Sequence, residues 1–195
     1  MRERVVLATR NRHKVGEIRA AIALPRVTFE TLDEHPEAPD VEEDGATFVA
    51  NARKKAHAVA RVTGLVALAD DSGLVVPALG GEPGVRSARY AGPHADDAAN
   101  RRKLVARLRE LAPNDRAARV VCVLVRATPG GDEVVAEGVC QGTLLVEERG
   151  NGGFGYDPLF VPEGFERTFA EIGQDEKAAV SHRGRALRNL AALWP

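Results

Sequence analysis

The sequence predicts an α/β fold, because short apolar runs typical of buried strands alternate with stretches of helical periodicity. Residues 5–8 and 65–69 are the clearest apolar runs. Between them, residues 48–62 are rich in alanine and are followed by Gly64, a residue that commonly ends a helix. A chain of 195 residues is expected to form one domain, residues 1–195, with two lobes that share a core.

Composition narrows the classes of function. The chain is 44% hydrophobic and 28% charged, the balance of an ordinary soluble domain. Its net charge of -1 provides no global field for a nucleic-acid polymer or a membrane surface, so neither is an expected partner. Cys122 and Cys140 lie in β-rich runs, which indicates small core residues in a reducing compartment. The first apolar run is too short for a signal peptide or a membrane span, so we expect a cytoplasmic protein.

The N-terminal unit has the pattern of an anion site. Residues 5–8 lead through a polar turn at residues 9–14 into helical spacing over residues 15–22, which Pro25 stops. Such a turn presents backbone N–H groups and the positive end of the helix dipole. Lys14, one turn into the helix, could reach the same anion. The alternative is a plain helix cap with a surface lysine.

An acidic segment follows a strand predicted over residues 27–32 at an edge of the sheet. Residues 33–44 are typical of a solvated loop. Glu43, near the end of this segment, is either a charge favoured at a helix start or a metal ligand placed beside Asp71.

The predicted helix over residues 48–62 carries two polar residues on one face. Asn51 and Lys55 are four positions apart, whereas Lys54 points elsewhere and is expected to be exposed. Lysine occupies only five of the 27 basic positions, so a lysine marks a place that favours a compact charge.

The stretch from Leu68 to Leu74, LADDSGL, is the centre of the predicted site. The apolar run stops at Asp70 and Asp71, and a tight bend is expected there. Two adjacent carboxylates repel each other unless a cation or a shared proton offsets the repulsion. The alternative is a turn in which Asp70 bonds to the backbone.

The glycines of a turn-rich loop at residues 80–84 either bend the chain or let a ligand approach the backbone. The elements after it are interpreted as structural. They are an amphipathic helix beginning at Asp96 or Asp97, a hairpin of residues 120–127 and 133–136, and a continuation of the sheet over residues 138–146.

A glycine-rich loop spans residues 150–158. It is not a phosphate-binding P-loop, because no Gly-Lys-Ser/Thr follows. Phe154 on such a loop could stack on a flat ring such as a nucleobase, or it could pack the loop on the core. For Tyr156 we favour packing.

The last helix is predicted to begin after Ser181, a suitable N-cap. His182 and Arg183 are then expected at its exposed start. They are either a clamp for a polar ligand or structural residues.

The chain resembles the inosine triphosphate pyrophosphatase family along nearly its whole length. The resemblance depends on five stretches in order: TRNRHK (9–14), EDGATF (43–48), ADDSGL (69–74), GGFGYDP (152–158) and EKAAVSHRG (176–184). PGVRSARYAG (83–92) is also similar. The resemblance implies an elongated two-lobed α/β fold around a long twisted mixed sheet, with a cleft between the lobes. It also implies a homodimer.

The resemblance further implies roles for individual residues. Asp71 would be the general base, and Glu43, Asp71 and Asp70 would hold Mg²⁺. The substrate-binding residues would be Thr9, Arg10, Asn11, Arg12, His13, Lys14, Lys55, Ser72, Phe154, Gly155, Tyr156, Asp157, Lys177, His182 and Arg183.

The implied reaction is hydrolysis of non-standard purine nucleoside triphosphates (ITP, dITP, XTP) to the monophosphate and pyrophosphate. Mg²⁺ accepts two carboxylates plus phosphate oxygens, and repulsion between Asp70 and Asp71 would make the empty site a cation trap. Lys177 and Arg183 would donate to the 6-oxo group of the base, which adenine lacks. Two other functions compete with this one: a pyrophosphatase for modified pyrimidine or methylated nucleotides, and a non-enzymatic nucleotide sensor.

Overall fold

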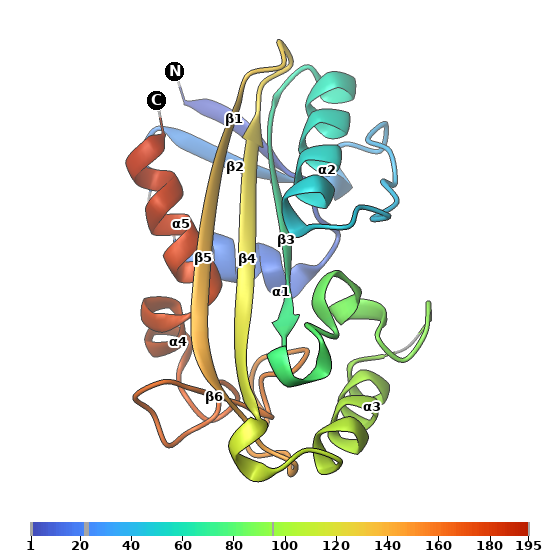
Figure 1. Ribbon diagram of the computed structural model, residues 1–195. Coiled ribbons are helices and arrows are strands. Elements are labelled where there is room, and N and C mark those ends of the chain that lie inside the picture. The colour runs from blue at the N-terminus through green and yellow to red at the C-terminus, as the bar shows by residue number, and fades with distance from the viewer. Residues whose placement is uncertain (1, 22–23, 95, 195) are drawn as a thin grey trace.

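The computed structural model describes residues 2–21, 24–94 and 96–194 and contains one six-stranded sheet in the order β2-β1-β3-β4-β5-β6 (Figure 1). The strands are β1 (Glu3–Leu7), β2 (Val27–Thr31), β3 (Val66–Val75), β4 (Ala117–Ala127), β5 (Glu133–Leu144) and β6 (Phe160–Pro162). The helices are α1 (Arg12–Ala21), α2 (Phe48–Thr63), α3 (Asp97–Arg109), α4 (Gln174–Val180) and α5 (His182–Leu193). Short 3₁₀ helices span Leu32–Glu34, Pro77–Leu79, Gly84–Arg89 and Pro113–Asp115.

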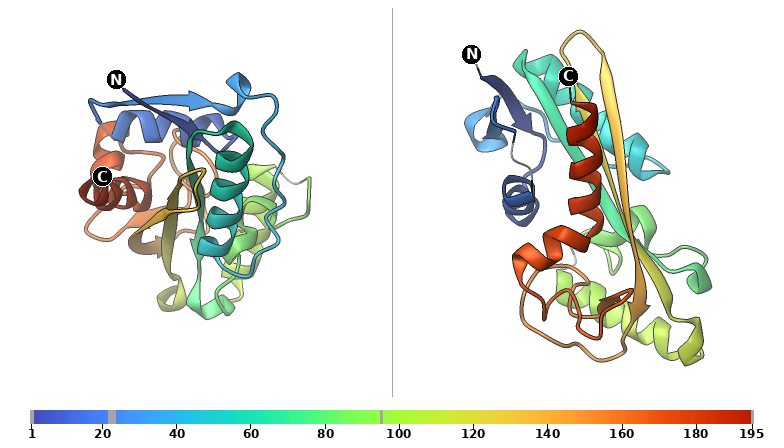
Figure 2. Two further views of the ribbon diagram at one scale, coloured as in Figure 1. Left: turned by 90° about the horizontal axis from the view of Figure 1, so that it is seen from above. Right: turned by 90° about the vertical axis from the view of Figure 1, so that its left-hand side faces the viewer.

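The sheet is mixed and long. β1 pairs in parallel with β2 and β3, whereas β3, β4, β5 and β6 pair antiparallel. The three central strands run side by side along the length of the molecule, and β1 and β2 are turned strongly relative to them (Figures 1 and 2). The predicted α/β class, the long mixed sheet, the hairpin and the edge position of β2 are confirmed.

Helices cover both faces of this sheet because successive side chains of a strand point to opposite faces. Ala67 and Ala69 of β3 pack against α2, whereas Leu68 packs on the other face in a core shared with α5 and α1. A third core joins α3 to the far ends of the long strands. The site residues lie where these cores meet.

Local sequence signals place the ends of α2 and α3. Thr47 caps α2 by accepting from the Ala50 N–H, and Gly64 ends the helix with a φ of 67°. Asp96 caps α3 by accepting from the Ala99 N–H. Both helices are therefore confirmed.

The tight bend expected at Asp70 and Asp71 is wrong. β3 continues through both residues to Val75 and pairs with β4 from Ala67 onward, Asp70 opposite Leu124 and Asp71 opposite Val123. Since the neighbouring strand satisfies the backbone groups, no turn is needed, and the carboxylates find side-chain partners instead.

Gly73 lets the segment Gly84–Arg89 approach β3 closely. A Cβ at this position would lie 2.5 Å from both the Gly84 carbonyl oxygen and Ser87 Oγ. Ser87 Oγ accepts from the Leu74 N–H at 2.9 Å, which fixes this segment beside the site.

Three further points concern the cysteines, the first helix and membrane-spanning helices. Cys122 and Cys140 are buried and free, as predicted. The predicted position of Ile22 in the first helix lies outside the described residues. Within the described ranges, no helix has both the length and the apolar character needed to cross a membrane.

Candidate active site

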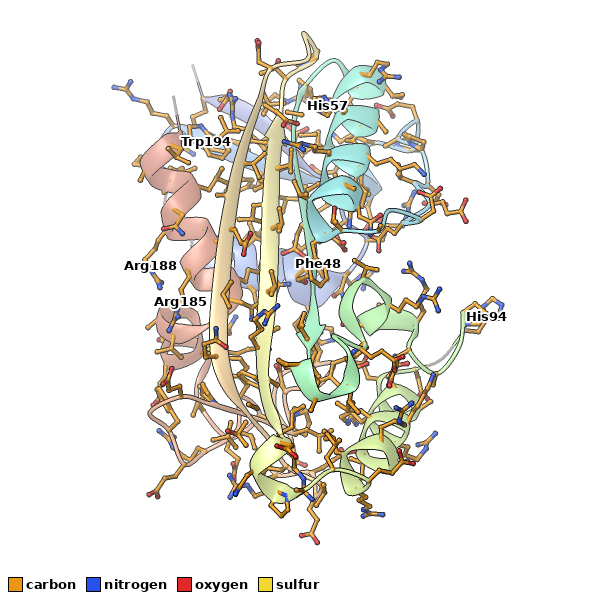
Figure 3. The ribbon with its side chains drawn as sticks, viewed as in Figure 1. Phe48, His57, His94, Arg185, Arg188 and Trp194 are labelled. Atoms are coloured by element: carbon orange, nitrogen blue, oxygen red, sulfur yellow. The ribbon has the colours of Figure 1, made fainter. Side chains whose placement is uncertain are left out.

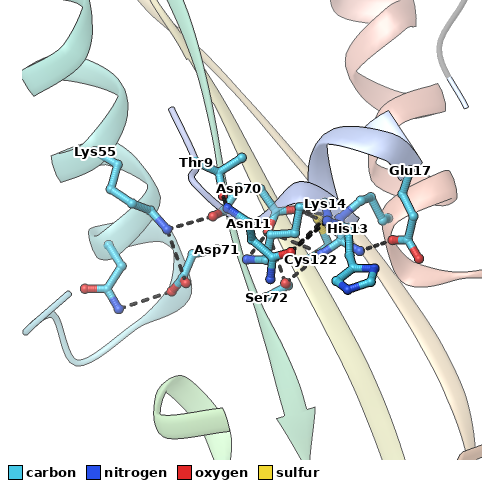
Figure 4. A network of polar contacts seen from close by, with 12 residues as sticks. Thr9, Asn11, His13, Lys14, Glu17, Lys55, Asp70, Asp71, Ser72 and Cys122 are labelled. Carbon is cyan, nitrogen blue, oxygen red and sulfur yellow. Dashed lines mark hydrogen bonds and ion pairs between the residues drawn. The ribbon is translucent and has the colours of Figure 1, made fainter. Parts of the chain in front are cut away.

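Asp70 and Asp71 belong to two different clusters. As neighbours in β3 they point to opposite faces of the sheet, Asp71 toward α2 and Asp70 toward α1 and α5 (Figure 4). Both are buried, with 1% and 5% of their surface exposed. The expected cation trap made by their mutual repulsion is therefore wrong, because the two carboxylates do not face each other.

On the α2 face, Asp71 meets the two polar residues of α2. Asn51 Nδ2 donates to Asp71 Oδ2 at 3.1 Å, and Lys55 Nζ lies 3.5 Å from Asp71 Oδ1. Lys55 also donates to the backbone oxygen of Asp70 at 2.7 Å. Burial raises the pKa of Asp71 despite the attraction of Lys55, and the nearby charge of Glu43 raises it further. Asp71 is thus a more basic carboxylate than an exposed aspartate.

Glu43 joins this face from the acidic segment. Its Oε1 lies 2.5 Å from Lys55 Nζ, and its backbone oxygen accepts from Arg89 Nη2 at 2.5 Å. Gly45 N–H donates to Asn51 Oδ1 at 2.8 Å, which attaches the segment to α2. The prediction that Glu43 lies beside Asp71 is confirmed.

Glu43 and Asp71 are the two carboxylates of this face that could contribute ligands to a divalent cation. Lys55 already places one positive charge between the two carboxylates. Among the described residues, no group of three or more His, Cys, Asp or Glu side chains could hold a metal ion. An ion at this point would therefore need further oxygen ligands from a bound molecule or water, which is how Mg²⁺ usually binds.

On the opposite face, Asp70 is held by cations. Arg183 Nε donates to Asp70 Oδ2 at 2.8 Å, and Lys14 Nζ lies 2.5 Å from Asp70 Oδ1. Cys122 Sγ donates to the same carboxylate at 3.1 Å. Burial opposes ionisation, but the charges of Arg183 and Lys14 outweigh it and hold the pKa of Asp70 well below its usual value. The expectation that Asp70 is a metal ligand is accordingly corrected: it is the anion of a buried ion-pair cluster.

The turn before α1 is a capped helix start, and its use as an anion site stays a prediction. Asn11 Oδ1 accepts from the backbone N–H groups of His13 at 2.9 Å and Lys14 at 3.3 Å. Asn11 is thus the N-cap, and its own N–H donates to Thr9 Oγ1 at 3.2 Å. The start of α1 and the ammonium group of Lys14 meet in this turn.

Glu17 is a residue that the sequence reasoning missed. It lies one turn after Lys14 in α1, and its carboxylate receives Lys177 Nζ at 2.7 Å and Arg183 Nη1. Burial opposes ionisation of Glu17, but Arg183 and Lys177 lower its pKa overall. The available signal was an acidic residue three positions after Lys14, on the same side of a helix.

Lys177 connects Glu17 to the glycine-rich loop. Its Nζ lies 2.6 Å from Asp157 Oδ2, and Asp157 Oδ2 also accepts from the Phe154 N–H at 2.9 Å. Burial lowers the affinity of Lys177 for a proton, but Asp157 and Glu17 raise its pKa overall. Lys177 is therefore a fixed cation beneath Phe154.

The exposed start predicted for the last helix is wrong, although Ser181 is its N-cap as predicted. His182 is 6% exposed and Arg183 is 1% exposed, because α5 packs its first turn against β5 and β4. Burial, followed by the charges of Arg183 and Lys177, lowers the pKa of His182 well below its usual value, so the ring is neutral. Its buried Nδ1 has no hydrogen-bond partner among the described residues.

The side chains of both faces line one cleft with two ends. One end, a cavity of about 290 Å³, is lined by Thr9, Arg10, Asn11, Lys14, Glu43 and Lys55 among others. The other end, about 130 Å³, is lined by Asp71, Ser72, Phe154, Gly155, Tyr156, Asp157, Lys177, His182 and Arg183 among others. Both ends are lined by Asn11, Lys14 and Glu43. The cleft therefore passes from a turn rich in cations and N–H groups to an aromatic wall.

Three predicted site residues do not line this cleft. Asp70 lies beneath it, and Arg12 and His13 lie outside it, exposed. Arg10 is at its rim, where its Nε donates to Asp40 Oδ1 at 2.7 Å. Tyr156 packs against the core, as predicted, and its Oη donates to the Ser87 oxygen at 2.9 Å.

A larger open groove of about 1310 Å³ lies between residues 42–48 and 80–93. It shares Glu43 with the cleft but is not lined by Asp71 or by the cations Lys14 and Lys55. The chemistry described above therefore belongs to the smaller cleft.

The chain is similar to known proteins along nearly its whole length. A sequence profile described as the Ham1 family matches residues 5–193. A dITP/XTP pyrophosphatase of Streptomyces avermitilis is 50% identical over 192 residues, covering 97% of this chain and 96% of that protein. Another, of Syntrophobacter fumaroxidans, is 55% identical over 186 residues, covering 95% of this chain and 79% of that protein.

Solved structures show the same fold. A HAM1 protein from Coxiella burnetii matches with a TM-score of 0.90 and 41% identity, covering 98% of both chains. A nucleoside-triphosphatase / dITP/XTP pyrophosphatase from Mycobacterium abscessus matches with a TM-score of 0.79 and 45% identity, covering 98% of this chain and 99% of that one.

Proposed function

The chain belongs to the Ham1 family, and we propose that it is a pyrophosphatase that hydrolyses non-standard purine nucleoside triphosphates. ITP, dITP and XTP are the proposed substrates, and the products are the nucleoside monophosphate and pyrophosphate. One observation carries the proposal: a turn suited to anions and an aromatic wall with fixed donors lie at the two ends of one cleft, with Asp71 lining it.

The phosphate end must bind a strongly negative group although the whole chain has a net charge of -1. Lys14, Lys55 and the N-terminus of α1 gather positive charge there. Both lysines are paired with carboxylates, so incoming phosphates would compete for their N–H groups.

Mg²⁺ is the proposed cofactor, held by Glu43 and Asp71. When bound, it would offset phosphate charge and lower the pKa of a bound water. Lys55 would shift from between the two carboxylates toward the phosphates as the charge around it changes.

Asp71 is the proposed general base. Its raised pKa makes it a better proton acceptor than an exposed aspartate, and Asn51 fixes one carboxylate oxygen. Asp71 would take a proton from the water whose oxygen bonds to the α-phosphorus. The bond from the α-phosphorus to the bridging oxygen breaks, and pyrophosphate leaves with that electron pair.

The base end contains few hydrogen-bond donors without a partner. A site of this kind can distinguish bases that present an acceptor from bases that present a donor. Lys177 uses two of its three N–H groups on Glu17 and Asp157. Arg183 uses four of its five on Asp70, Glu17 and Ser72. With respect to the described part of the chain, one N–H group of Lys177 and one of Arg183 have no acceptor.

These two donors match an acceptor at position 6 of the purine. Hypoxanthine and xanthine present an oxygen there, whereas adenine presents an amino group that would leave both donors unpaired. Mismatches of this kind in a desolvated pocket lower kcat/KM for the wrong substrate by factors of roughly 10² to 10⁵. Phe154 would provide the stacking surface for the base.

The test is release of pyrophosphate from ITP, XTP, ATP, dUTP and 5-methyl-UTP, each with and without Mg²⁺. Rapid, magnesium-dependent release from ITP and XTP, with slow release from the others, is expected. Preference for the pyrimidines would support the competing pyrophosphatase, and tight ITP binding without turnover would support a sensor. Either result would overturn the proposal.

A homodimer and a cytoplasmic location are also proposed, from the family resemblance and from composition. Sedimentation velocity of the purified chain tests the first, and cell fractionation tests the second.

A further inference from the structure

His13 and Phe154 form a stacked pair. Their ring centroids are 5.1 Å apart and their planes differ by 14°. His13 belongs to the first turn of α1, and Phe154 belongs to the glycine-rich loop. The contact therefore joins the proposed phosphate end to the proposed base end.

Both partners are anchored by residues that line the cleft. Asn11 Oδ1 holds the His13 N–H at 2.9 Å, and Asp157 Oδ2 holds the Phe154 N–H at 2.9 Å. The stack is thus tied at both ends to side chains that a bound nucleotide would touch.

Phe154 and His13 differ in their relation to the cleft. Phe154 lines the base end together with Lys177 and Arg183, whose charged groups lie 5.2 and 5.8 Å from the ring centroid. His13 does not line it and is exposed. A base cannot lie between the two rings, since that needs about 7 Å, twice the roughly 3.4 Å spacing of stacked bases.

We propose that His13 is a positioning residue that backs Phe154, so that ligand binding produces a three-layer stack of His13, Phe154 and purine. The inference rests on the proposed function. The imidazole restrains the ring of Phe154, which sits on a loop with positive-φ glycines on both sides, Gly153 and Gly155. A ring whose orientation is already fixed loses less conformational entropy when the base binds.

A different arrangement makes the opposite prediction. If His13 covered the face that receives the base, it would be a plug that the ligand must displace. Removing its ring would then tighten binding rather than weaken it.

The experiment compares His13→Ala and His13→Phe with the wild type. His94→Ala is the matched control, because His94 is an exposed histidine at the tip of a loop (Figure 3) and lines neither end of the cleft. Calorimetry measures the Kd of inosine monophosphate, and inhibition of ITP hydrolysis measures the affinity for inorganic tripolyphosphate, which has no base.

We expect His13→Ala to weaken inosine monophosphate binding by roughly two- to tenfold, the range for loss of one aromatic pair. His13→Phe should restore the affinity, and kcat for ITP should change less than KM. Tripolyphosphate inhibition should be unchanged in all variants, because the phosphate turn is intact.

Several results would overturn the inference. Tighter inosine monophosphate binding by His13→Ala would identify a plug, and equal weakening for tripolyphosphate would place the defect in the phosphate turn. If His13→Ala binds inosine monophosphate as tightly as the wild type, or if His13→Phe does not restore the affinity, the ring of His13 does not support Phe154. A wild-type protein that neither hydrolyses ITP nor binds inosine monophosphate would instead refute the proposed function, and this inference with it.

Discussion

Arg183 Nε lies 2.8 Å from Asp70 Oδ2, so the last helix is joined to the central strand by an ion pair that is almost fully buried. Desolvating two charges is costly, and their attraction offsets that cost only while both partners are present. The pair therefore makes the position of α5 depend on β3.

Arg183→Ala should destabilise the fold as well as alter selectivity. It leaves Asp70 with Lys14 as its only ionic partner among the described residues, and loss of one partner of a buried pair costs about 3–5 kcal/mol. Urea unfolding measures the change. Arg188→Ala, an exposed position in the same helix, should cost less than about 1 kcal/mol. Equal losses for the two variants would contradict the role given to the pair.

Asp71→Asn should abolish most turnover while substrate binding is retained. The amide keeps the shape of the side chain but cannot accept a proton, and general-base catalysis contributes about 10²- to 10⁴-fold. Steady-state kinetics with ITP should show this loss in kcat. Asp44→Asn is the control, since Asp44 is exposed and pairs with Lys54. An Asp71→Asn protein with normal turnover would show that another group is the base.

Glu17→Gln should narrow the preference for ITP over ATP. The amide cannot balance the charges of Lys177 and Arg183, so both donors lose their fixed orientation. We expect the ratio of kcat/KM for ITP to kcat/KM for ATP to fall by about tenfold or more. Hydrogen-bond donors of this kind can contribute a discrimination of roughly 10² to 10⁵ in that ratio. Glu110→Gln at the end of α3 is the control. If the ratio is unchanged, Glu17 does not position the donors.

Gly138→Ala should destabilise the packing of α5 on β5. A Cβ at this position would lie 2.1 Å from the His182 oxygen and 2.3 Å from the Ala186 nitrogen. Overpacking of this kind costs about 1–3 kcal/mol and would displace the helix that carries His182 and Arg183. Gly16→Ala in α1 meets nothing within 4 Å and should instead stabilise by roughly 0.5–1 kcal/mol. Thermal unfolding of both variants distinguishes the two outcomes.

His35 should make stability depend on pH. Its ring lies 2.8 Å from Glu30 and 3.2 Å from Glu37, and although burial lowers its pKa, these partners raise it overall. A raised folded-state pKa adds stability that is complete below the unfolded value of about 6.5 and is lost as pH rises through the folded value.

The measurement is the difference in Tm between the wild type and His35→Gln. The wild-type advantage should be larger at about pH 5.5 than at about pH 9. A difference that is constant over this range would mean that His35 acts only by packing.

The sequence by itself determined the local features of this protein. Local signals are complete within one or two helical turns, so the cap at Ser181, the end of α2 at Gly64 and the shared face of Asn51 and Lys55 could be predicted. The order of the motifs was also sufficient to indicate the family.

Only the tertiary structure decided how the charges are distributed. β4 supplied a pairing partner that carried β3 straight through Asp70 and Asp71, which separated two adjacent carboxylates onto opposite faces. The first turn of α5 was buried, and Glu17 became the partner of Arg183. Glu17 and Arg183 are more than a hundred positions apart in the chain. The energy of a buried ion pair depends on desolvation, which no local pattern contains.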